Sequence, residues 1–464
     1  MSKIEVNAIE PQCGTTLTVG ASGDTITFPT GTTIVNNGSQ TGFGRTGTVD
    51  WDTTAKTATF TAVSGNGYFV NTTAGVITVN LPASPSAGDI VSISDYAGTA
   101  ATNNITIARN GSNFEGGTSN GEIIVNRQAV TLIYVDGTQG WVPTAESDSS
   151  FQQPLYVTAT GGTITCCGNY KIHTFTGPGT FCVSCAGNTL GNNKLDYLVV
   201  AGGGSAGGAG NPSTYASGGG GGGGYRESKA SGAPWSASPL ATCVSLTASS
   251  GPNAVVVGGG GAAATQPTKT GGQGNNSTFM TITSSGGGGG LQDGGFAPTP
   301  GGQAAQGGSG GGGGASPTGD VGNGNVPSVS PAQGTPGGFG SGQSETAGGG
   351  GGGASARGLP ASPNAATTSG GTGGNGVATS ISGSSVTRAG GGGGGYGYNS
   401  VPTGSPGAGG SGGGGAGSNG PNSATAGTIN TGGGGGGVTG SYGPANAFGA
   451  LGGSGIVIIR YKFQ

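Results

Sequence analysis

The sequence has few of the residues on which most enzyme chemistry depends. Of its 464 residues, 7% are charged, 6% are aromatic and one is a histidine, His173. A single histidine makes a catalytic triad or a metal centre within one chain implausible. The formal net charge is −3 and lysine and arginine do not cluster, so the electrostatic footprint of a nucleic-acid-binding protein is missing. We therefore expect no catalytic residues, no metal or other cofactor, and no nucleic-acid partner.

Long hydrophobic runs are also missing. No stretch approaches the ~18 apolar residues of a membrane span. The opening "MSKIEVNAIE" lacks the basic and apolar segments of a signal peptide. We expect synthesis in a cytosol without export.

Cysteine is too scarce for a disulfide scaffold in a chain of this length. The six cysteines are Cys13, Cys166, Cys167, Cys182, Cys185 and Cys243. Two adjacent cysteines bind one metal ion poorly, so a zinc site at Cys166, Cys167, Cys182 and Cys185 is disfavoured against a disulfide or buried thiols. His173 fits one face of a strand, although three copies around a trimer axis would be able to bind an ion.

Glycine is the residue that the chain has in excess. Of 115 glycines, 89 lie in the 264 residues from Ala201 to Gln464, where they form nine runs of three or more. Runs such as Gly348 to Gly353 break the G-X-Y period of collagen. Disordered chains are usually highly charged and poor in aromatics, which this chain is not. We expect the glycine region to be folded.

The first part of the chain reads as short β-strands. Residues 1–44 contain alternating apolar and Thr/Ser positions from Thr15 to Val35 and end in a connector, Asn36 to Gly44. Residues 45–147 space their strands by roughly 8–12 residues, which favours a β-sandwich or jelly roll without α-helix. The predicted strands are Thr57 to Val63, Gly67 to Asn71, Val76 to Leu81, Ile90 to Asp95, Ile105 to Ala108, Glu122 to Asn126 and Val130 to Val135.

Residues 148–200 are predicted to lead into the glycine region. A polar hinge, Ala145 to Pro154, precedes two strands, Tyr170 to Thr176 and Thr180 to Ser184, whose Gly-Pro-Gly connection is typical of a hairpin. Two strongly apolar segments, Leu195 to Ala201 and Gly455 to Phe463, bracket residues 201–464. We expect these two segments to pair and to close the glycine region at its base.

The glycine runs themselves predict polyglycine II helices. Such a helix has three residues per turn and no internal hydrogen bonds, so its amide and carbonyl groups point outward. Without Cβ atoms, neighbouring helices approach closely enough to bond one another. One hydrogen bond contributes about 1 kcal/mol, whereas ordering a residue costs roughly 1–2 kcal/mol. Only an array whose inner helices bond on several sides is therefore stable.

Loops joining such helices would carry most of the side chains of the region. Tyr, Asn, Ser, Gly and Pro dominate them, as in binding loops on rigid scaffolds. The loops are Tyr225 to Trp235, Leu291 to Pro300, Asn325 to Phe339, Tyr396 to Gly407 and Ser441 to Gly449. The candidate receptor contacts are Tyr396, Tyr398, Asn399, Phe296, Phe339, Tyr442 and Phe448. The alternative is that these aromatics shield glycine backbone.

Several quoted stretches resemble known proteins. "HTFTGPGTF", "DYLVVAGGG", "GGGGYRE" and "GGSGIVIIRY" resemble the glycine-rich domain of many bacteriophage tail fibres and adhesins. The N-terminal "MSKIEVNAIEPQCGTTLTVGASGDTITFPTGTTI" resembles the start of tail fibres from aquatic phages. Related tip adhesins present receptor-binding loops on layers of polyglycine II helices, but as separate proteins, so only the architecture is carried over.

The resemblance implies a virion protein, made in the host cytoplasm and acting outside the cell. It implies a homotrimer, attachment to other tail proteins through the N-terminus, and host attachment through an outer-membrane protein or glycan receptor. The alternatives are a structural fibre without a receptor role, an ice-binding polyglycine protein and a glycan depolymerase tailspike. The Pro-rich loops disfavour ice binding, and the scattered carboxylates disfavour a depolymerase.

Overall fold

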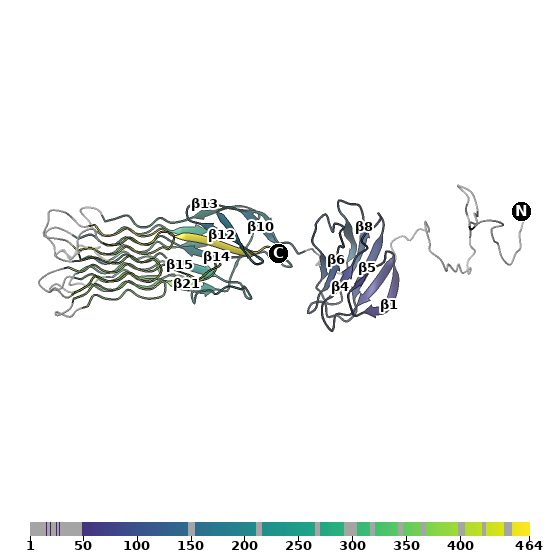
Figure 1. Ribbon diagram of the computed structural model, residues 1–464, viewed down its shortest axis with the longest axis horizontal. Helices are drawn as coiled ribbons and strands as arrows, with labels where there is room; N and C mark the ends of the chain where they lie inside the picture. Colours follow the sequence, from purple (N-terminus) through teal and green to yellow (C-terminus); the bar gives the residue numbers. More distant parts are fainter. Residues whose placement is uncertain are drawn as a thin grey trace, which may run out of the picture.

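The computed structural model is all β (Figure 1). It describes residues 15, 19, 25, 27, 49–146, 154–209, 216–264, 270–291, 304–315, 321–341, 347–362, 368–397, 404–419, 424–439 and 448–464. These residues form 23 strands and no helix, which confirms the all-β fold class. No helix able to cross a membrane therefore occurs in this part of the chain.

Residues 49–146 form two sheets that share one core. The first sheet has the order β1-β3-β5-β8-β9 and the second has the order β2-β4-β6-β7. Their strands are β1 (Asp50–Lys56), β2 (Phe60–Thr61), β3 (Asn66–Val70), β4 (Ile77–Asn80), β5 (Ile90–Asp95), β6 (Ile105–Ala108), β7 (Gly121–Ile123), β8 (Ala129–Tyr134) and β9 (Trp141–Glu146). Apolar side chains from both sheets, including Ile93, Ile107 and Trp141, are fully buried between them.

From β1 to β6, consecutive strands of this unit alternate between the two sheets. As a result β1, β3 and β5 lie parallel in one sheet, and β2, β4 and β6 lie parallel in the other. Only β7, β8 and β9 add antiparallel pairs. The two layers form a sandwich. From β1 to β6, however, the chain crosses from one sheet to the other after each strand instead of forming hairpins within a sheet.

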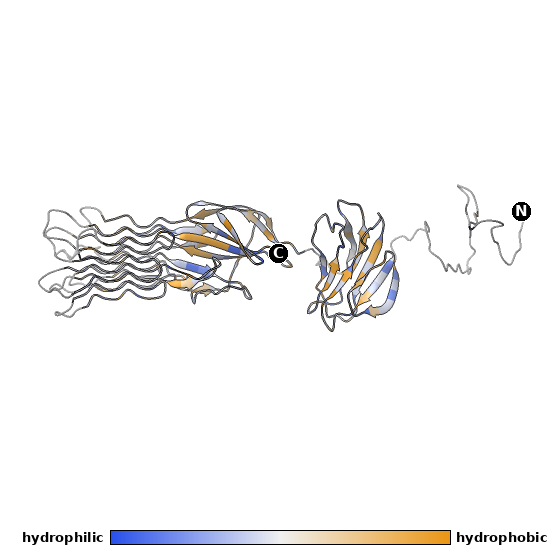
Figure 2. Ribbon diagram, in the orientation of Figure 1, coloured by the Kyte–Doolittle hydropathy of each residue, from blue (hydrophilic) through white to orange (hydrophobic). Residues whose placement is uncertain are grey.

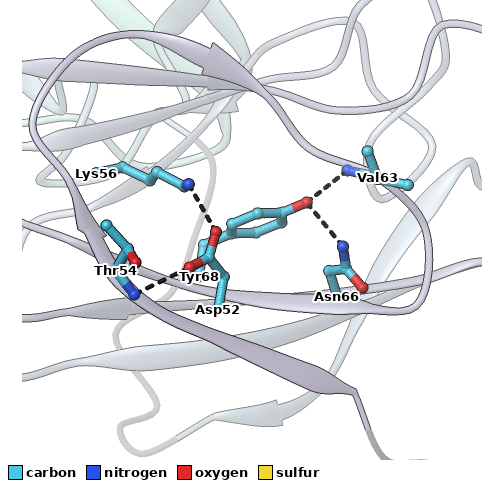
Figure 3. Close-up of polar contacts among 6 residues, drawn as sticks. All are labelled: Asp52, Thr54, Lys56, Val63, Asn66 and Tyr68. Carbon is cyan, nitrogen blue, oxygen red and sulfur yellow. Dashed lines mark hydrogen bonds and ion pairs between the residues drawn. The ribbon is translucent and has the colours of Figure 1, made fainter.

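The first strand, β1, is irregular, and a polar contact between Asp52 and Lys56 spans the irregular part (Figure 3). The pairing of β1 with β3 shifts register between Asp52 and Lys56. Within this shift the Lys56 Nζ lies 2.6 Å from Asp52 Oδ2, and the Thr54 amide donates to Asp52 Oδ1 at 2.9 Å. The hydrogen bond from Lys56 lowers the pKa of the Asp52 carboxyl. Beside it, the buried Tyr68 hydroxyl accepts a bond from the Val63 amide.

Residues 154–464 form a second folded unit with strands at one end. One sheet has the order β10-β13-β18-β19-β20, and the other has β11-β12-β23-β14-β15-β16 with β17 on β14. A separate hairpin joins β21 to β22. The strands are β10 (Val157–Thr160), β11 (Thr163–Cys167), β12 (Tyr170–Phe175), β13 (Gly179–Ala186), β14 (Lys194–Val200), β15 (Tyr225–Ser228), β16 (Ala241–Thr242), β17 (Leu246–Thr247), β18 (Gly251–Val256), β19 (Ser277–Phe279), β20 (Ile282–Ser284), β21 (Val377–Thr379), β22 (Val386–Arg388) and β23 (Ile456–Lys462).

The two apolar segments that bracket the glycine region do pair, as predicted. β14 and β23 run antiparallel, with Asp196 opposite Arg460 and Val200 opposite Ile456. Both strands are buried on both faces. One face packs against the five-stranded sheet, and the other packs against Trp235 and the β21–β22 hairpin. This explains why their sequences are continuously apolar rather than alternating, and the hydropathy colouring shows them as a hydrophobic band (Figure 2).

The predicted hairpin across Gly-Pro-Gly is wrong. β12 pairs with β11 and β23, whereas β13 pairs with β10 and β18 in the facing sheet. A tight hairpin turn needs a positive φ, and neither Gly177 nor Gly179 has one. The connection is instead a corner between two packed sheets.

The expected disulfide or buried thiols are also wrong for the described cysteines. Cys166 and Cys167 lie exposed on β11, and Cys182 and Cys185 lie on β13 in the other sheet. Together with the exposed Cys243 these residues are free thiols. Cys13 lies outside the described residues.

His173 is part of the core between the two sheets. It is fully buried, its Nδ1 donates to the Gly161 carbonyl at 2.7 Å, and its Nε2 lies 3.0 Å from the Tyr461 hydroxyl. Because Nδ1 faces a carbonyl, it carries the proton of the neutral ring, and Nε2 accepts from Tyr461. Both ring nitrogens are therefore used within one chain, which leaves neither for a metal ion.

Burial lowers the pKa of His173, and this makes the stability of the unit pH-dependent. Stability is complete above the unfolded pKa of about 6.5 and falls as the pH drops towards the lowered folded value, by at most about 1.4 kcal/mol per pH unit. Thermal unfolding between pH 7.5 and 5.5 measures this slope. The His173→Phe variant should unfold at a lower temperature but with a flatter pH dependence. Equal slopes would contradict the assignment.

Beyond the strands, the glycine region forms a bundle of extended rods (Figure 1). Here a rod is an extended segment outside the strands whose backbone bonds go to other segments. The rods are 201–209, 216–224, 257–264, 270–276, 285–291, 304–308, 309–315, 321–325, 335–341, 347–353, 357–362, 368–376, 389–397, 404–410, 414–419, 424–428, 433–439 and 448–455. They are nearly white in the hydropathy colouring, because glycine is neither polar nor apolar (Figure 2).

The rod 216–224 shows the bonding rule. Its seven glycine amides donate bonds of 2.8–3.0 Å, and every third amide goes to the same neighbour. Gly218, Gly221 and Gly224 donate to carbonyls of rod 285–291. Gly219 and Gly222 donate to carbonyls of rod 347–353. Gly220 donates to Gly435 in rod 433–439, and Gly223 donates to Gly432 just before that rod. A period of three is the repeat of polyglycine II.

The carbonyls of the same rod face three further neighbours. They accept from the rods 201–209, 309–315 and 389–397. Rod 216–224 is thus bonded to six others, which is the hexagonal arrangement that a helix of threefold symmetry with alternating donors and acceptors permits. The rods 347–353 and 389–397 are likewise bonded to six segments. The bundle is therefore a lattice held by main-chain bonds, with its polar backbone buried but paired.

Candidate functional site

The lattice has two different ends. At one end the rods continue into β14, β15, β18, β19, β23 and the other strands, or into short turns. We call this the strand end. At the other, the far end, the rods stop beside the segments that lie outside the described residues. Backbone bridges between Ala216 and Thr439, and between Ala347 and Tyr396, join neighbouring rods there.

Small apolar side chains close the lattice at the far end. Ala209 and Val438 are buried together with Ala424 beside them, and Ala347, Ala361 and Tyr396 form a second cluster. Within the described part of the lattice, many rods thus end in a small side chain instead of glycine, as at Ala209, Ala264 and Ala315. The far end is thus a rigid plate, and the rods that end there are connected in the sequence by nine segments that lie outside the described residues: 210–215, 265–269, 292–303, 316–320, 342–346, 363–367, 398–403, 420–423 and 440–447.

Tyr396 lies in this plate rather than above it. It is 4% exposed, and its amide donates to the Ser418 carbonyl at 2.9 Å. A Cβ on Gly404 would come within 2.4 Å of the tyrosine ring, so the ring lies directly on this glycine. This placement matches the alternative interpretation of the loop aromatics, in which the ring shields glycine backbone.

Phe339 and Phe448 are the candidate contacts with exposed rings. Phe339 is 44% exposed, and the Arg357 guanidinium carbon lies 4.9 Å from its ring centroid. Phe448 is 40% exposed and begins the last rod, 448–455. The two rings belong to different rods, and no contact between them is found in the described part of the chain. The remaining candidates, Phe296, Tyr398, Asn399 and Tyr442, lie outside the described residues.

Two of the predicted binding loops differ from this expectation. The loop Tyr225 to Trp235 lies at the strand end, and so does the predicted loop Asn325 to Phe339 up to the start of rod 335–341. Residues 225–235 begin with β15, and both Tyr225 and Trp235 are buried in the core beneath the lattice. In residues 325–335 the buried Gln333 side chain bonds the Pro327 carbonyl and the Ser285 amide. These loops secure the lattice to the sheets, so they are not part of the far-end surface.

The buried carboxylate of Glu227 at the strand end is satisfied by structural bonds. The Glu227 carboxylate accepts from the Tyr225 hydroxyl at 2.9 Å, from the Ser238 amide at 3.1 Å and from the Thr379 hydroxyl at 2.5 Å. Burial raises the pKa of Tyr225 and lowers that of Arg388, which lies close enough to interact with Glu227. These bonds join β15, the following loop and the β21–β22 hairpin, so the cluster is a clamp rather than a reactive centre.

A second buried pair reinforces the clamp. Asp196 accepts from the Ser245 hydroxyl at 2.6 Å and from the Ala230 amide at 2.8 Å, and burial raises its pKa. Arg460, opposite it on β23, is 2% exposed, and its guanidinium carbon lies 4.6 Å from the Trp235 ring centroid and 5.0 Å from that of Tyr170. The guanidinium is held between two aromatic faces.

Sequence reasoning missed one feature of the described surface. A groove of about 480 Å³ lies beside the lattice near the strand end, and it is lined by Gln273, Gly274, Asn275, Asn276, Ser285, Gln306, Val326 and Pro327. The stretch "GGQGNNS" was the available signal, because three carboxamides follow closely in a region where side chains are sparse.

Comparison with known proteins yields one match. A family model described as a glycine-rich domain matches residues 175–462, which include the last residue of β12, all of β13 and β14, the lattice and β23. No curated protein matches the chain. The matched range begins before the first glycine run, in keeping with the pairing of β12 and β14 with β23.

Proposed function

From the premise that this chain belongs to the glycine-rich domain family, we propose that it is a bacteriophage tail fibre that binds a receptor on the bacterial surface. The observation that carries the proposal is the asymmetry of the lattice. One end continues into two sheets, and at the other end the rods stop at a rigid plate, where nine segments outside the described residues connect them in the sequence. A rigid scaffold with variable segments at one end is the usual architecture of recognition proteins.

The binding itself is non-covalent in this proposal. The far-end segments, flanked by Phe339, Phe448 and Tyr396, contact an outer-membrane protein or a surface glycan. Residues 1–44 attach the fibre to other tail proteins, and three copies associate into a homotrimer. Three weak contacts on one trimer then gain strength from shared tethering. The protein acts on the virion, outside the cell, after synthesis in the host cytoplasm.

Replacing the far-end segments one at a time tests the proposal. Each of the nine segments is exchanged for Gly/Ser residues of equal length in the fibre of the assembled virion, and adsorption to the bacterium that the virion infects is measured. We expect at least one exchange to lower the adsorption rate constant tenfold or more, because it removes contact side chains while the rods remain bonded.

The matched control is an exchange at the strand end. The exposed Val244, between β16 and β17, and the exposed Ile429, in the turn after rod 424–428, are replaced by serine and should leave adsorption unchanged. If all nine far-end exchanges adsorb like the unaltered virion, the proposed receptor role is wrong and a structural fibre is the better interpretation.

A further inference from the structure

The groove near the strand end is separate from the far-end segments. Its walls come from the rod 270–276, from Ser285 and Gln306, and from the loop residues Val326 and Pro327. Its volume of about 480 Å³ is within the ~300–1,000 Å³ of small-molecule sites. No charged residue lines it.

The walls of the groove are fixed by hydrogen bonds. Asn276 Oδ1 accepts from the Gly286 amide at 2.9 Å, and Gln273 Nε2 donates to the Gln306 carbonyl at 3.0 Å. On the opposite wall, Pro327 is held through its carbonyl by Gln333, whose side chain is 1% exposed. The groove is therefore preformed, and a ligand entering it pays little ordering entropy.

Several carboxamide groups in the groove have no partner in the described part of the chain. They are Asn276 Nδ2, Gln273 Oε1 and the whole side-chain amide of Gln306. Together they offer donors and acceptors next to each other, as a pair of neighbouring hydroxyl groups requires. Val326 and Pro327 supply an apolar wall beside them. Such a mixture of neutral hydrogen-bonding groups and one apolar surface suits the two sides of a pyranose ring.

We propose that this groove is a saccharide site that binds a neutral hexose through the carboxamides of Gln273, Asn276 and Gln306, with Val326 and Pro327 against the apolar face of the sugar ring. The site is independent of the far-end segments and goes beyond the proposed receptor binding. An uncharged ligand follows from the uncharged lining, because a charged sugar would lose hydration without gaining an ionic partner.

Saturation-transfer NMR on the full chain tests the site with four probes: glucose, galactose, mannose and N-acetylglucosamine. At least one should bind with a dissociation constant in the millimolar range. In the double variant Gln273→Ala/Gln306→Ala that affinity should fall at least tenfold. Both side chains are exposed, and within the described residues they make one bond, from Gln273 Nε2 to the Gln306 carbonyl. The fold should therefore be retained, which an unchanged unfolding temperature verifies.

The control variant is Asn323→Ala, an exposed carboxamide on the neighbouring rod 321–325 that does not line the groove. It should bind the same hexose with unchanged affinity. The proposal is overturned if no hexose binds the unaltered chain, or if the double variant binds as well as the control. It is also overturned if only an acetylated trialanine amide binds, since the groove would then recognise peptide. Exchange of the far-end segments should leave hexose binding intact, which separates this test from that of receptor binding.

Discussion

Substituting Gly220 by alanine should destabilise the C-terminal unit by about 4 kcal/mol. A Cβ at this position would lie 2.1 Å from the Gly204 carbonyl oxygen and 2.7 Å from its carbon, in a rod surrounded by six others. Both atoms belong to backbone, so the rods must separate. The bonds from Gly220 to Gly435 and from Gly435 to Gly204 would then be lost. Two bonds at about 1 kcal/mol each and a further 1–3 kcal/mol of overpacking strain give the estimate.

The measurement is the denaturant midpoint of unfolding, compared with that of Gly259→Ala. Gly259 lies in the rod 257–264 of the same lattice, but it is exposed, and the nearest atom to an added Cβ is Asn275 Nδ2 at 3.8 Å. This control should change stability by no more than about 0.5 kcal/mol. Similar midpoints for the two variants would mean that the rods are not packed through their backbones, and the lattice would be refuted.

Removing β23 by ending the chain at Gly455 should abolish folding of the C-terminal unit. The strand lies between β12 and β14 and pairs with both. Five of its side chains, Ile456, Val457, Ile458, Ile459 and Tyr461, are at most 5% exposed. At ~1.5–3 kcal/mol for each buried side chain, the loss is on the order of 10 kcal/mol, comparable with the whole stability of a domain.

Limited proteolysis and circular dichroism of the chain that ends at Gly455 provide the measurement. A chain lacking only Phe463 and Gln464 is the control. It loses the bond from the Phe463 amide to the Asn169 carbonyl and the contact of Lys171 with the Phe463 ring, but it keeps every pair of β23. It should resist protease like the unaltered chain. If the chain ending at Gly455 also resisted, β23 would not be the element that closes the lattice.

Sequence reasoning succeeded where the signal was local or strongly compositional. The strand predicted at Ile90 to Asp95 coincides with β5, and that at Ile105 to Ala108 coincides with β6. The pairing of the two apolar segments was predicted because neither segment alternates with polar residues. The polyglycine lattice was predicted because glycine has no Cβ atom. In both cases the residues themselves leave few other ways to bury the backbone.

Prediction from the sequence failed where the strands or segments that contact each other are far apart along the chain. β9 was not predicted because Pro143 interrupts it, yet β9 is an edge strand, where proline is tolerated. The parallel winding of residues 49–146 and the crossing of β12 and β13 into different sheets depend on which strands meet, and short apolar runs do not encode this. The carboxamide groove was missed for the same reason, since its walls come from rods and loops up to 54 positions apart, from Gln273 to Pro327.

The lattice also determines how the molecule bears mechanical force. Its hydrogen bonds run across the rods, and the first rod begins from β14 while the last ends in β23, its direct neighbour. Tension applied at the far end and resisted at the strand end therefore acts along the rods and strains many transverse bonds together. In this shear geometry, many hydrogen bonds between two rods must break at the same time before the rods slide. When a rod is instead pulled away from one end, its hydrogen bonds break one after another at a lower force. The backbone hydrogen bonds that require glycine in the rods thus also make the lattice resistant to a pulling force.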